Sequence, residues 1–139
     1  AVDKVGNRTS VVEANADRVT WSYDTSCQLT REQRSGADGY DDEYKYDPVG
    51  NRNAKIADGA RTTTTYDAAN QIIYSEAAAG RTTYAFDNNG NQQLVEEPNG
   101  DRTTTSWDHE NQPTLYQLPG AALVTMSYNA DNRRVRKES

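Results

Sequence analysis

The amino-acid sequence predicts an all-β fold in which short β-hairpins of about 20 residues follow one another as a continuous antiparallel meander. Three observations support this prediction. An aromatic residue followed by Asp recurs at intervals of 20 to 23 residues. Gly or Asn stands four residues after most of these aromatic residues, and both tolerate the left-handed backbone that a tight turn requires. Turn-forming residues also come about every ten residues, which is typical of a meander.

The aromatic residue, position 0 of each repeat, is expected at the end of the first strand of a hairpin. The six copies are Tyr23, Tyr46, Tyr66, Phe86, Trp107 and Tyr128, and Val2 takes this position in a truncated first copy. Residues two apart in a strand share a face, so Trp21 and Tyr23 are expected on one face. Arg at position −5, as in Arg18, falls on the other face.

The turn follows the aromatic residue directly. Asp at position +1 can accept bonds from backbone N–H groups further along the turn, and a Gly or Asn at +4 suits a type I turn closed by a left-handed residue. The turn acids are Asp24, Asp47, Asp67, Asp87 and Asp108, and the residues at +4 are Gly50, Asn70, Gly90, Asn111 and Asn132. Cys27 at +4 departs from the pattern. Position +6 should then pair with position 0, as Leu29 with Tyr23.

The remaining elements follow in the same order. The runs Thr62–Thr65 and Thr103–Thr105 fit first strands, because Thr favours strands over helices. A second set of turns is expected at Asp58-Gly59, Gly80, Pro98–Gly100 and Pro119-Gly120. About thirteen strands result. Residues 34–43 are read as a surface-loop insertion, and helix is expected only as single turns around 13–17 and 76–79.

A sheet of this many strands is expected to curl, because twist prevents open sheets of more than about ten strands from staying flat. We expect a spiral sheet, a tube or a partial shell, with the aromatic face inside and Thr, Arg and Asp on the other face. The chain is read as a single array, residues 1–139, of about six repeats. It opens within a repeat, which is expected of a fragment of a longer repeat protein or of a fibre protomer.

Charge and composition argue against several classes of partner. The net charge of −6 and the pI of about 4.7 argue against nucleic acid or an anionic membrane as partner. The basic run Arg133–Lys137 is read as a solvated strand or tail. Cys27 is the only cysteine, so no internal disulfide can form. No apolar run approaches the roughly 18 residues of a membrane span, and the first residues do not have the pattern of a signal peptide.

The repeats resemble a known family. Tyr66-Asp67 through Ile72, preceded by Gly59 through Thr63, is similar to the YD repeat of the Rhs proteins. So are residues 80–91 and 46–52, and the resemblance covers essentially the whole chain. Relatives include bacterial polymorphic toxins, insecticidal toxin-complex subunits and teneurins. The resemblance implies a large spiral β-sheet that is secreted or displayed on the cell surface. It also implies a non-enzymatic wall, which encloses a toxin in the bacterial members and serves adhesion in teneurins.

Two features depart from that family. Its toxin-enclosing shells are usually several times longer than this chain. Asp47-Pro48 resembles the Asp-Pro motif of the family's self-cleaving segment, but it sits in register as an ordinary repeat turn.

Residues that could carry chemistry have plainer structural interpretations. The run Asp87–Asn91 resembles a calcium loop, but Pro98 stands where an EF-type loop needs Glu. His109, the only histidine, lies between two acids on an expected turn tip. No nucleophile elbow or phosphate loop is present. The aromatic stripe could be a sugar platform, yet packing between rings is favoured because the stripe occurs in every copy.

The sequence therefore predicts a structural scaffold rather than an enzyme, with no cofactor and no metal. Expected partners are further YD repeats in cis or identical copies end to end, with an enclosed toxin or a glycan as additional ligands. Nucleic acid and membrane insertion are not expected. The alternative is an adhesion module that binds glycans or a cell-surface receptor. Both predictions place the protein outside the cell or on its surface.

Overall fold

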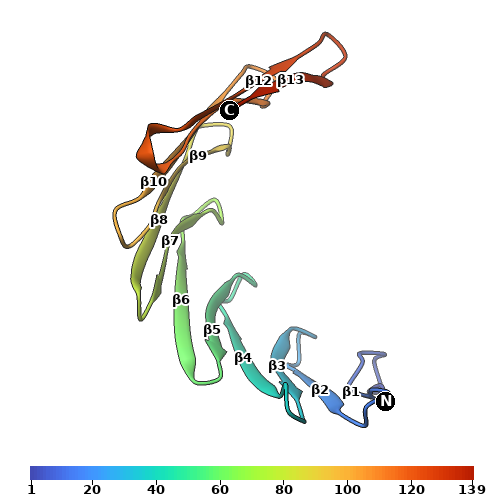
Figure 1. Cartoon of the computed structure of the whole chain (residues 1–139). Coiled ribbons are helices and arrows are strands. Elements are labelled where there is room, and N and C mark those ends of the chain that lie inside the picture. The colour runs from blue at the N-terminus through green and yellow to red at the C-terminus, as the bar shows by residue number, and fades with distance from the viewer. The chain divides into compact units, whose positions relative to one another are not determined.

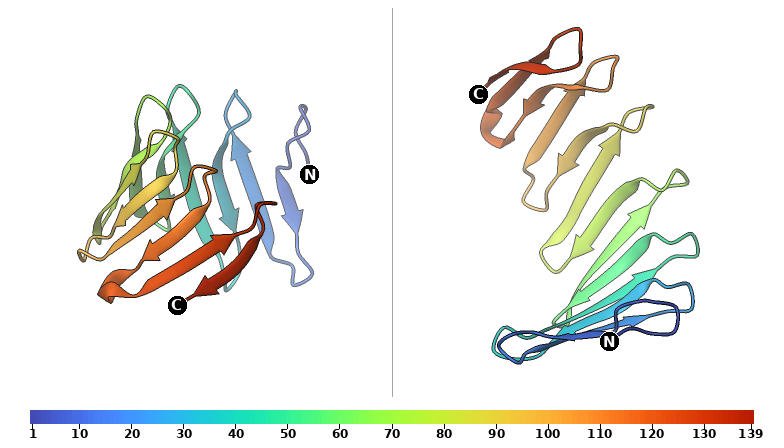
Figure 2. Two further views of the ribbon diagram at one scale, coloured as in Figure 1. Left: turned by 90° about the horizontal axis from the view of Figure 1, so that it is seen from above. Right: turned by 90° about the vertical axis from the view of Figure 1, so that its right-hand side faces the viewer.

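The computed structural model describes residues 1–139 and consists almost entirely of antiparallel β-strands (Figure 1). The chain divides into two units, Ala1–Thr64 and Thr65–Ser139. Within each unit the strands neighbour one another in chain order and form a single layer (Figure 2). The predicted all-β meander and its thirteen strands are confirmed.

The first unit holds the first six strands, the last of which ends just beyond the unit's boundary. They are β1 (Ser10–Val12), β2 (Arg18–Tyr23), β3 (Leu29–Arg34), β4 (Tyr40–Tyr46), β5 (Arg52–Ala57) and β6 (Ala60–Tyr66). The second unit holds seven strands and one short helical turn. They are β7 (Ile72–Ala77), β8 (Gly80–Phe86), β9 (Gln92–Glu96), β10 (Arg102–Trp107), β11 (Pro113–Gln117), η1 (Pro119–Ala121), β12 (Leu123–Tyr128) and β13 (Arg134–Glu138).

Five hairpins, those of Tyr23, Tyr46, Phe86, Trp107 and Tyr128, have the same register at the turn. The aromatic residue pairs with position +6, and the register shifts by one residue directly before it, as a β-bulge. The predicted pairing of Tyr23 with Leu29 is confirmed. The backbone N–H at +4 donates to the carbonyl at +1, as from Gly50 to Asp47 at 3.1 Å. The turn is therefore a tight, bulge-forming hairpin loop.

Neighbouring hairpins pair over a shorter stretch. The ladder between one repeat and the next ends where position +8 meets position −3 of the following repeat, three residues before the aromatic residue. The pairs that end the ladders are Ser10 with Thr20, Arg31 with Glu43, Ala54 with Thr63, Tyr74 with Thr83, Leu94 with Thr104 and Leu115 with Thr125. Beyond this pair no further residues are paired between hairpins; at the first junction one backbone bond, from the Trp21 N–H to the Thr9 carbonyl at 2.9 Å, follows it. The strands then separate toward the turns.

The predicted loop of residues 34–43 is too long. Arg34 ends β3 and Tyr40 begins β4, so the loop proper is only residues 35–39. The extra residues of this repeat lie in that loop, and the Arg31–Glu43 pair keeps the common register. Side chains on a paired strand point alternately to the two faces of the sheet. With both faces open to water, the polar residues that flank the loop can therefore belong to strands.

The helical turns expected around 13–17 and 76–79 are also wrong. Both segments form tight turns between strands. The one helical turn is η1, where Pro119 and Gly120 suit a change of direction. No helix of this chain has the length and hydrophobicity that crossing a membrane requires.

The single layer encloses almost no core. Only Val19 and Ala54 are buried, at 5% and 2% exposure. The accessible surface is 9411 Å², whereas a compact monomer of 15.5 kDa has about 7,200 Å². Side chains on both faces therefore stay partly in contact with water, and stability depends on hydrogen bonds and cross-strand pairs. Winding of the array into a spiral, tube or shell stays a prediction.

Candidate functional site

The repeated Asp binds the backbone of its own turn. One carboxylate oxygen, Oδ1, accepts from the N–H groups at positions +3 and +5, as Asp47 does from Val49 and Asn51. The same pair of bonds, at 2.8 to 3.1 Å, occurs in all seven copies. Asn129 makes them with its amide oxygen. These bonds satisfy donors that the turn would otherwise leave to water.

Position +4 has left-handed backbone in every copy, with φ between +60° and +96°. Cys27, which breaks the residue pattern, adopts φ +61° and forms the same backbone bond to Asp24 at 3.1 Å. The turn geometry therefore overrides the preference of an individual side chain. An L-residue other than Gly or Asn held in this conformation is strained by about 1–2 kcal/mol.

An Asn at position +5 adds another bond to the turn. Its Nδ2 donates to the second carboxylate oxygen of the turn Asp at 3.0 Å in the pairs Asn7–Asp3, Asn51–Asp47 and Asn91–Asp87. The Asn91 side chain holds the pKa of Asp87 below its ordinary value, against the opposing effect of partial burial and with help from backbone N–H groups. In Asp3 and Asp47 burial acts to raise the pKa, but the hydrogen bonds outweigh it and lower the pKa.

The aromatic side chain at position 0 connects its repeat to the preceding one. Its polar hydrogen is donated to the backbone carbonyl at position +6 of the previous repeat, in the region where the ladder between hairpins has ended. We call this bond the ring clamp. Ring clamps join Tyr23 to Arg8 at 3.0 Å, Tyr46 to Leu29 at 2.8 Å, Trp107 to Gln92 at 3.0 Å and Tyr128 to Pro113 at 3.1 Å, among others.

The ring clamp explains why Tyr and Trp can exchange at this position, since the Trp107 Nε1–H replaces a Tyr hydroxyl. Phe86 has the ring but no polar hydrogen, so it cannot donate to Ile72, the corresponding +6 residue. All six aromatic residues are half-buried. Sequence reasoning missed the clamp, although the Tyr/Trp composition of position 0 was a visible signal for a donor.

The sequence predicted that charged residues would lie on the face opposite the aromatic residues. The aromatic face nevertheless carries charged residues in the first unit. Between hairpins, position +9 pairs with position −4 of the next repeat on this face. In the second unit these pairs are Ser75–Thr82, Val95–Thr103 and Tyr116–Val124. In the first unit the β3–β4 pair is Glu32–Asp42. Two like charges directly opposite each other are unfavourable in a sheet.

Nearby donors compensate for these two carboxylates. The Tyr40 hydroxyl donates to Glu32 at 2.7 Å, and this bond, with partial burial, raises the pKa of Tyr40 to about 12. Lys55 contacts Asp42 at 2.7 Å, and Tyr44 donates to the same carboxylate at 3.3 Å. The hydrogen bond to Asp42 raises the pKa of Lys55. The expected placement of charged residues on the opposite face alone is therefore wrong for the first unit.

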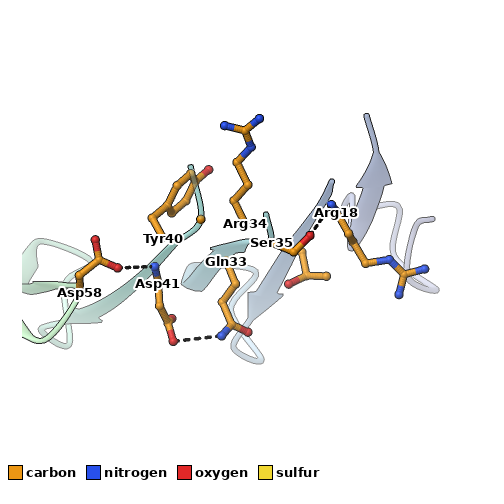
Figure 3. A pocket seen from close by; sticks show the side chains of 9 residues that line it. Arg18, Gln33, Arg34, Ser35, Tyr40, Asp41 and Asp58 are labelled. Atoms are coloured by element: carbon orange, nitrogen blue, oxygen red, sulfur yellow. Dashed lines mark hydrogen bonds between the residues drawn. The ribbon is translucent and has the colours of Figure 1, made fainter. Parts of the chain in front are cut away.

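A shallow groove of about 490 Å³ lies beside the loop of residues 35–39 (Figure 3). Gln33 donates to Asp41 at 3.0 Å, and the Asp41 N–H donates to Asp58 at 2.8 Å. Arg31, just outside the groove, donates a bidentate hydrogen bond to Asp41 and so holds the pKa of Asp41 below its ordinary value. Arg18 lines the groove and forms no ion pair. Arg18 is thus an exposed cation without an ion pair at one end of the groove, and its side chain points away from Gln33 and Asp41 (Figure 3).

The remaining candidates for chemistry are ordinary turn residues. Asp87 uses both carboxylate oxygens on donors of its own turn. Asp108 accepts from the N–H groups of Glu110 and Gln112, and His109 is exposed at the tip. No three Asp, Glu, His or Cys side chains come together as metal ligands. The predicted site residues are thus distributed along the array, one set per hairpin, and do not converge.

No family model matches the sequence, and no curated protein matches it. Solved structures do resemble it. The structure of TcdB2-TccC3-Cdc42 superposes with a TM-score of 0.62 at 14% identity, and that of TcdB2-TccC3 with 0.61 at 16%. TcdB2-TccC3 without its hypervariable C-terminal region gives 0.61 at 15%. Each match covers 99% of this chain and 11% of the other chain, so this chain spans about a ninth of the chains it matches. At such low identity the likeness concerns the fold, and this array has the fold of a segment of TcdB2-TccC3.

Proposed function

We propose that this chain is a non-enzymatic structural scaffold, a run of YD repeats that forms part of a β-sheet wall. The observation that carries the proposal is that the repeated polar groups bind the protein's own backbone. Each turn Asp binds its own turn, and each ring clamp joins a repeat to its predecessor. Groups committed to the backbone in every repeat are suited to building a wall and leave no converging set for catalysis.

The finer proposal concerns what the wall encloses and where it acts. The likeness to TcdB2-TccC3 and the resemblance of the repeats to Rhs proteins favour a secreted or surface-displayed wall built with further YD repeats in cis or from identical copies end to end. A toxin polypeptide is the proposed enclosed partner. Exposed strand edges favour such continuation, because an unpaired edge is a template for another strand.

Protease protection tests the proposal. In the parent protein that contains this array, a tethered reporter peptide placed after the repeats should resist protease as long as the array is intact. Replacing Tyr46 and Tyr128 together by Phe should loosen the wall and speed cleavage of the reporter, whereas Tyr84→Phe, which removes no ring clamp, should leave the cleavage rate unchanged. A reporter that is cleaved equally fast in all three proteins contradicts the enclosing wall.

A second candidate function, adhesion, is supported by the groove beside residues 35–39. Arg18 is an unpaired cation there, and the surrounding polar groups could bind hydroxyl-rich or anionic glycans. A glycan array tests this directly. Binding that is lost in Arg18→Ala but kept in Arg61→Ala, the same repeat position in another hairpin, supports adhesion, and an array without hits contradicts it.

A further inference from the structure

The turns along one edge of the sheet alternate between two kinds. Residues +4 and +5 read, in turn order, Gly6-Asn7, Cys27-Gln28, Gly50-Asn51, Asn70-Gln71, Gly90-Asn91 and Asn111-Gln112. Thus Asn follows Gly, and Gln follows a residue that has a side chain. The seventh turn, Asn132-Arg133, breaks the alternation, because a Gly-Asn turn should stand there.

The structure gives a reason why a turn with Gln at +5 is followed by a turn with Gly at +4. A Gln at +5 extends over position +4 of the next turn. The Nε2 of Gln28 lies 3.2 Å from where a Cβ on Gly50 would be, and Gln71 has the same relation to Gly90. That separation is tighter than most Cβ contacts, so a bare Gly is the residue that leaves room for the Gln amide.

A turn with Asn at +5 is followed by a turn whose +4 residue has a side chain, and here the shorter Asn amide makes the contact. The Nδ2 of Asn91 has two hydrogens, one donated to Asp87 at 3.0 Å and the other to Oδ1 of Asn111 in the next turn at 2.7 Å. Asn89 donates to the same oxygen at 3.2 Å. An Asn at +5 therefore fits a next turn that supplies an amide oxygen, which Gly cannot supply.

The break in the alternation coincides with an unsatisfied group. Gln112 should lie over a Gly at +4 of the next turn, but Asn132 stands there. Its side-chain oxygen, Oε1, is buried and has no hydrogen-bond partner. Gln28 and Gln71, which lie over Gly, have no such buried unpaired atom. Buried polar groups are normally paired, so this one marks a mismatch.

We propose that the +5 side chain of each turn selects the +4 residue of the next turn, so that the repeating unit of this array is a pair of hairpins. A turn with Gln at +5 accepts a hairpin with Gly at +4. A turn with Asn at +5 accepts a hairpin with a side chain at +4, which is Asn after Asn51 and Asn91 and Cys27 after Asn7. This turn ladder determines which hairpin, from the same chain or from a second copy, fits next to which. The proposal rests on the scaffold function and names the chemistry by which neighbouring repeats recognise each other.

One substitution at two equivalent sites tests the turn ladder. Asn132 and Asn111 have φ of 61° and 60°, so Asn→Gly relieves the same backbone preference at both. Asn132→Gly should give Gln112 the bare neighbour it lacks and raise the midpoint of urea denaturation. Asn111→Gly should remove the acceptor of Asn91 and Asn89 and lower the midpoint. The side-chain amide protons of Gln112 should also exchange more slowly in Asn132→Gly.

Equal shifts in the same direction would overturn the ladder, because position +4 would then act through its backbone alone. In that event the circular dichroism of both variants would still report a β-rich chain, so the scaffold proposal would stand. Loss of the β-rich spectrum in the unsubstituted chain would instead contradict the scaffold. The two failures are therefore distinguishable in one set of samples.

Discussion

Removing the hydroxyl of Tyr46 is expected to weaken the connection between two repeats without changing the packing of the ring. The hydroxyl donates to the Leu29 carbonyl at 2.8 Å in a partly buried position. A hydrogen bond of this kind contributes about 0.5–1.5 kcal/mol, so Tyr46→Phe should lower the free energy of unfolding by about 1 kcal/mol. The strands have no ladder bonds at this place to compensate.

Thermal and urea denaturation measure the effect. An entropy of unfolding typical for 139 residues converts about 1 kcal/mol into a Tm decrease of about 3 °C. If the unit Ala1–Thr64 unfolds separately, the same loss amounts to about 7 °C for that transition. Phe86→Tyr is the reverse experiment, and it should stabilise by about 0.5 kcal/mol, because the new hydroxyl could donate to the Ile72 carbonyl.

Tyr84→Phe is the matched control. Tyr84 lies on the same face, two residues before position 0, and is half-buried like Tyr46. Its hydroxyl is not part of a ring clamp, so its removal should leave the stability within about 0.5 kcal/mol of the original. If Tyr46→Phe costs no more than Tyr84→Phe, the ring clamp contributes nothing and the aromatic residues act through packing alone.

Three further substitutions test the turns. Asp87→Asn should flatten the acid limb of a plot of stability against pH. The pKa of Asp87 is lowered in the folded state, so the stabilisation by its carboxylate is complete above the unfolded pKa of 3.8 and is lost as pH falls through the folded pKa. Urea titrations at neutral pH and near pH 3 measure this loss. A dependence of stability on pH that is the same in Asp87→Asn contradicts it. Cys27→Gly should stabilise by about 1 kcal/mol, because φ +61° is strained for Cys and free for Gly; a lower Tm would show that the Cys27 side chain is needed. Gly80→Ala should destabilise by about 1–3 kcal/mol, since its Cβ would lie 2.9 Å from the Cβ of Pro98 at φ +118°; calorimetry measures the loss, and an unchanged Tm would mean that Pro98 moves aside.

The fold was predictable because its signals are local. Gly and Asn mark left-handed turn positions, and Asp marks the residue that binds the turn, all within six residues of chain. Alternation within strands then assigns Trp21 and Tyr23 to one face without knowledge of the neighbours. These rules need no information on which strands pair, so the thirteen strands and the Tyr23–Leu29 pairing follow from the sequence.

The missed features depend on the register between hairpins, which local signals do not specify. The ring clamp requires that the ladder end before position 0, and a hydrophobic pattern treats Tyr46 and Phe86 alike. The Glu32–Asp42 pair becomes visible only when β3 is placed against β4. The expected loop of residues 34–43 concealed that pairing, because polar residues beside Gly favour a loop in local reasoning.

The scarcity of enclosed side chains has a consequence for how freely this sequence can diverge. In a protein with a closely packed interior, most changes of side-chain size leave a void or a clash. Here Val19 and Ala54 are the only buried side chains, so most strand positions can change without either penalty. What must persist about every 20 residues is a turn acid or amide, a left-handed residue and an aromatic ring, with a ring donor in most repeats. Such a small set of requirements is consistent with an array that shares 14–16% of its residues with TcdB2-TccC3 while keeping the same backbone arrangement.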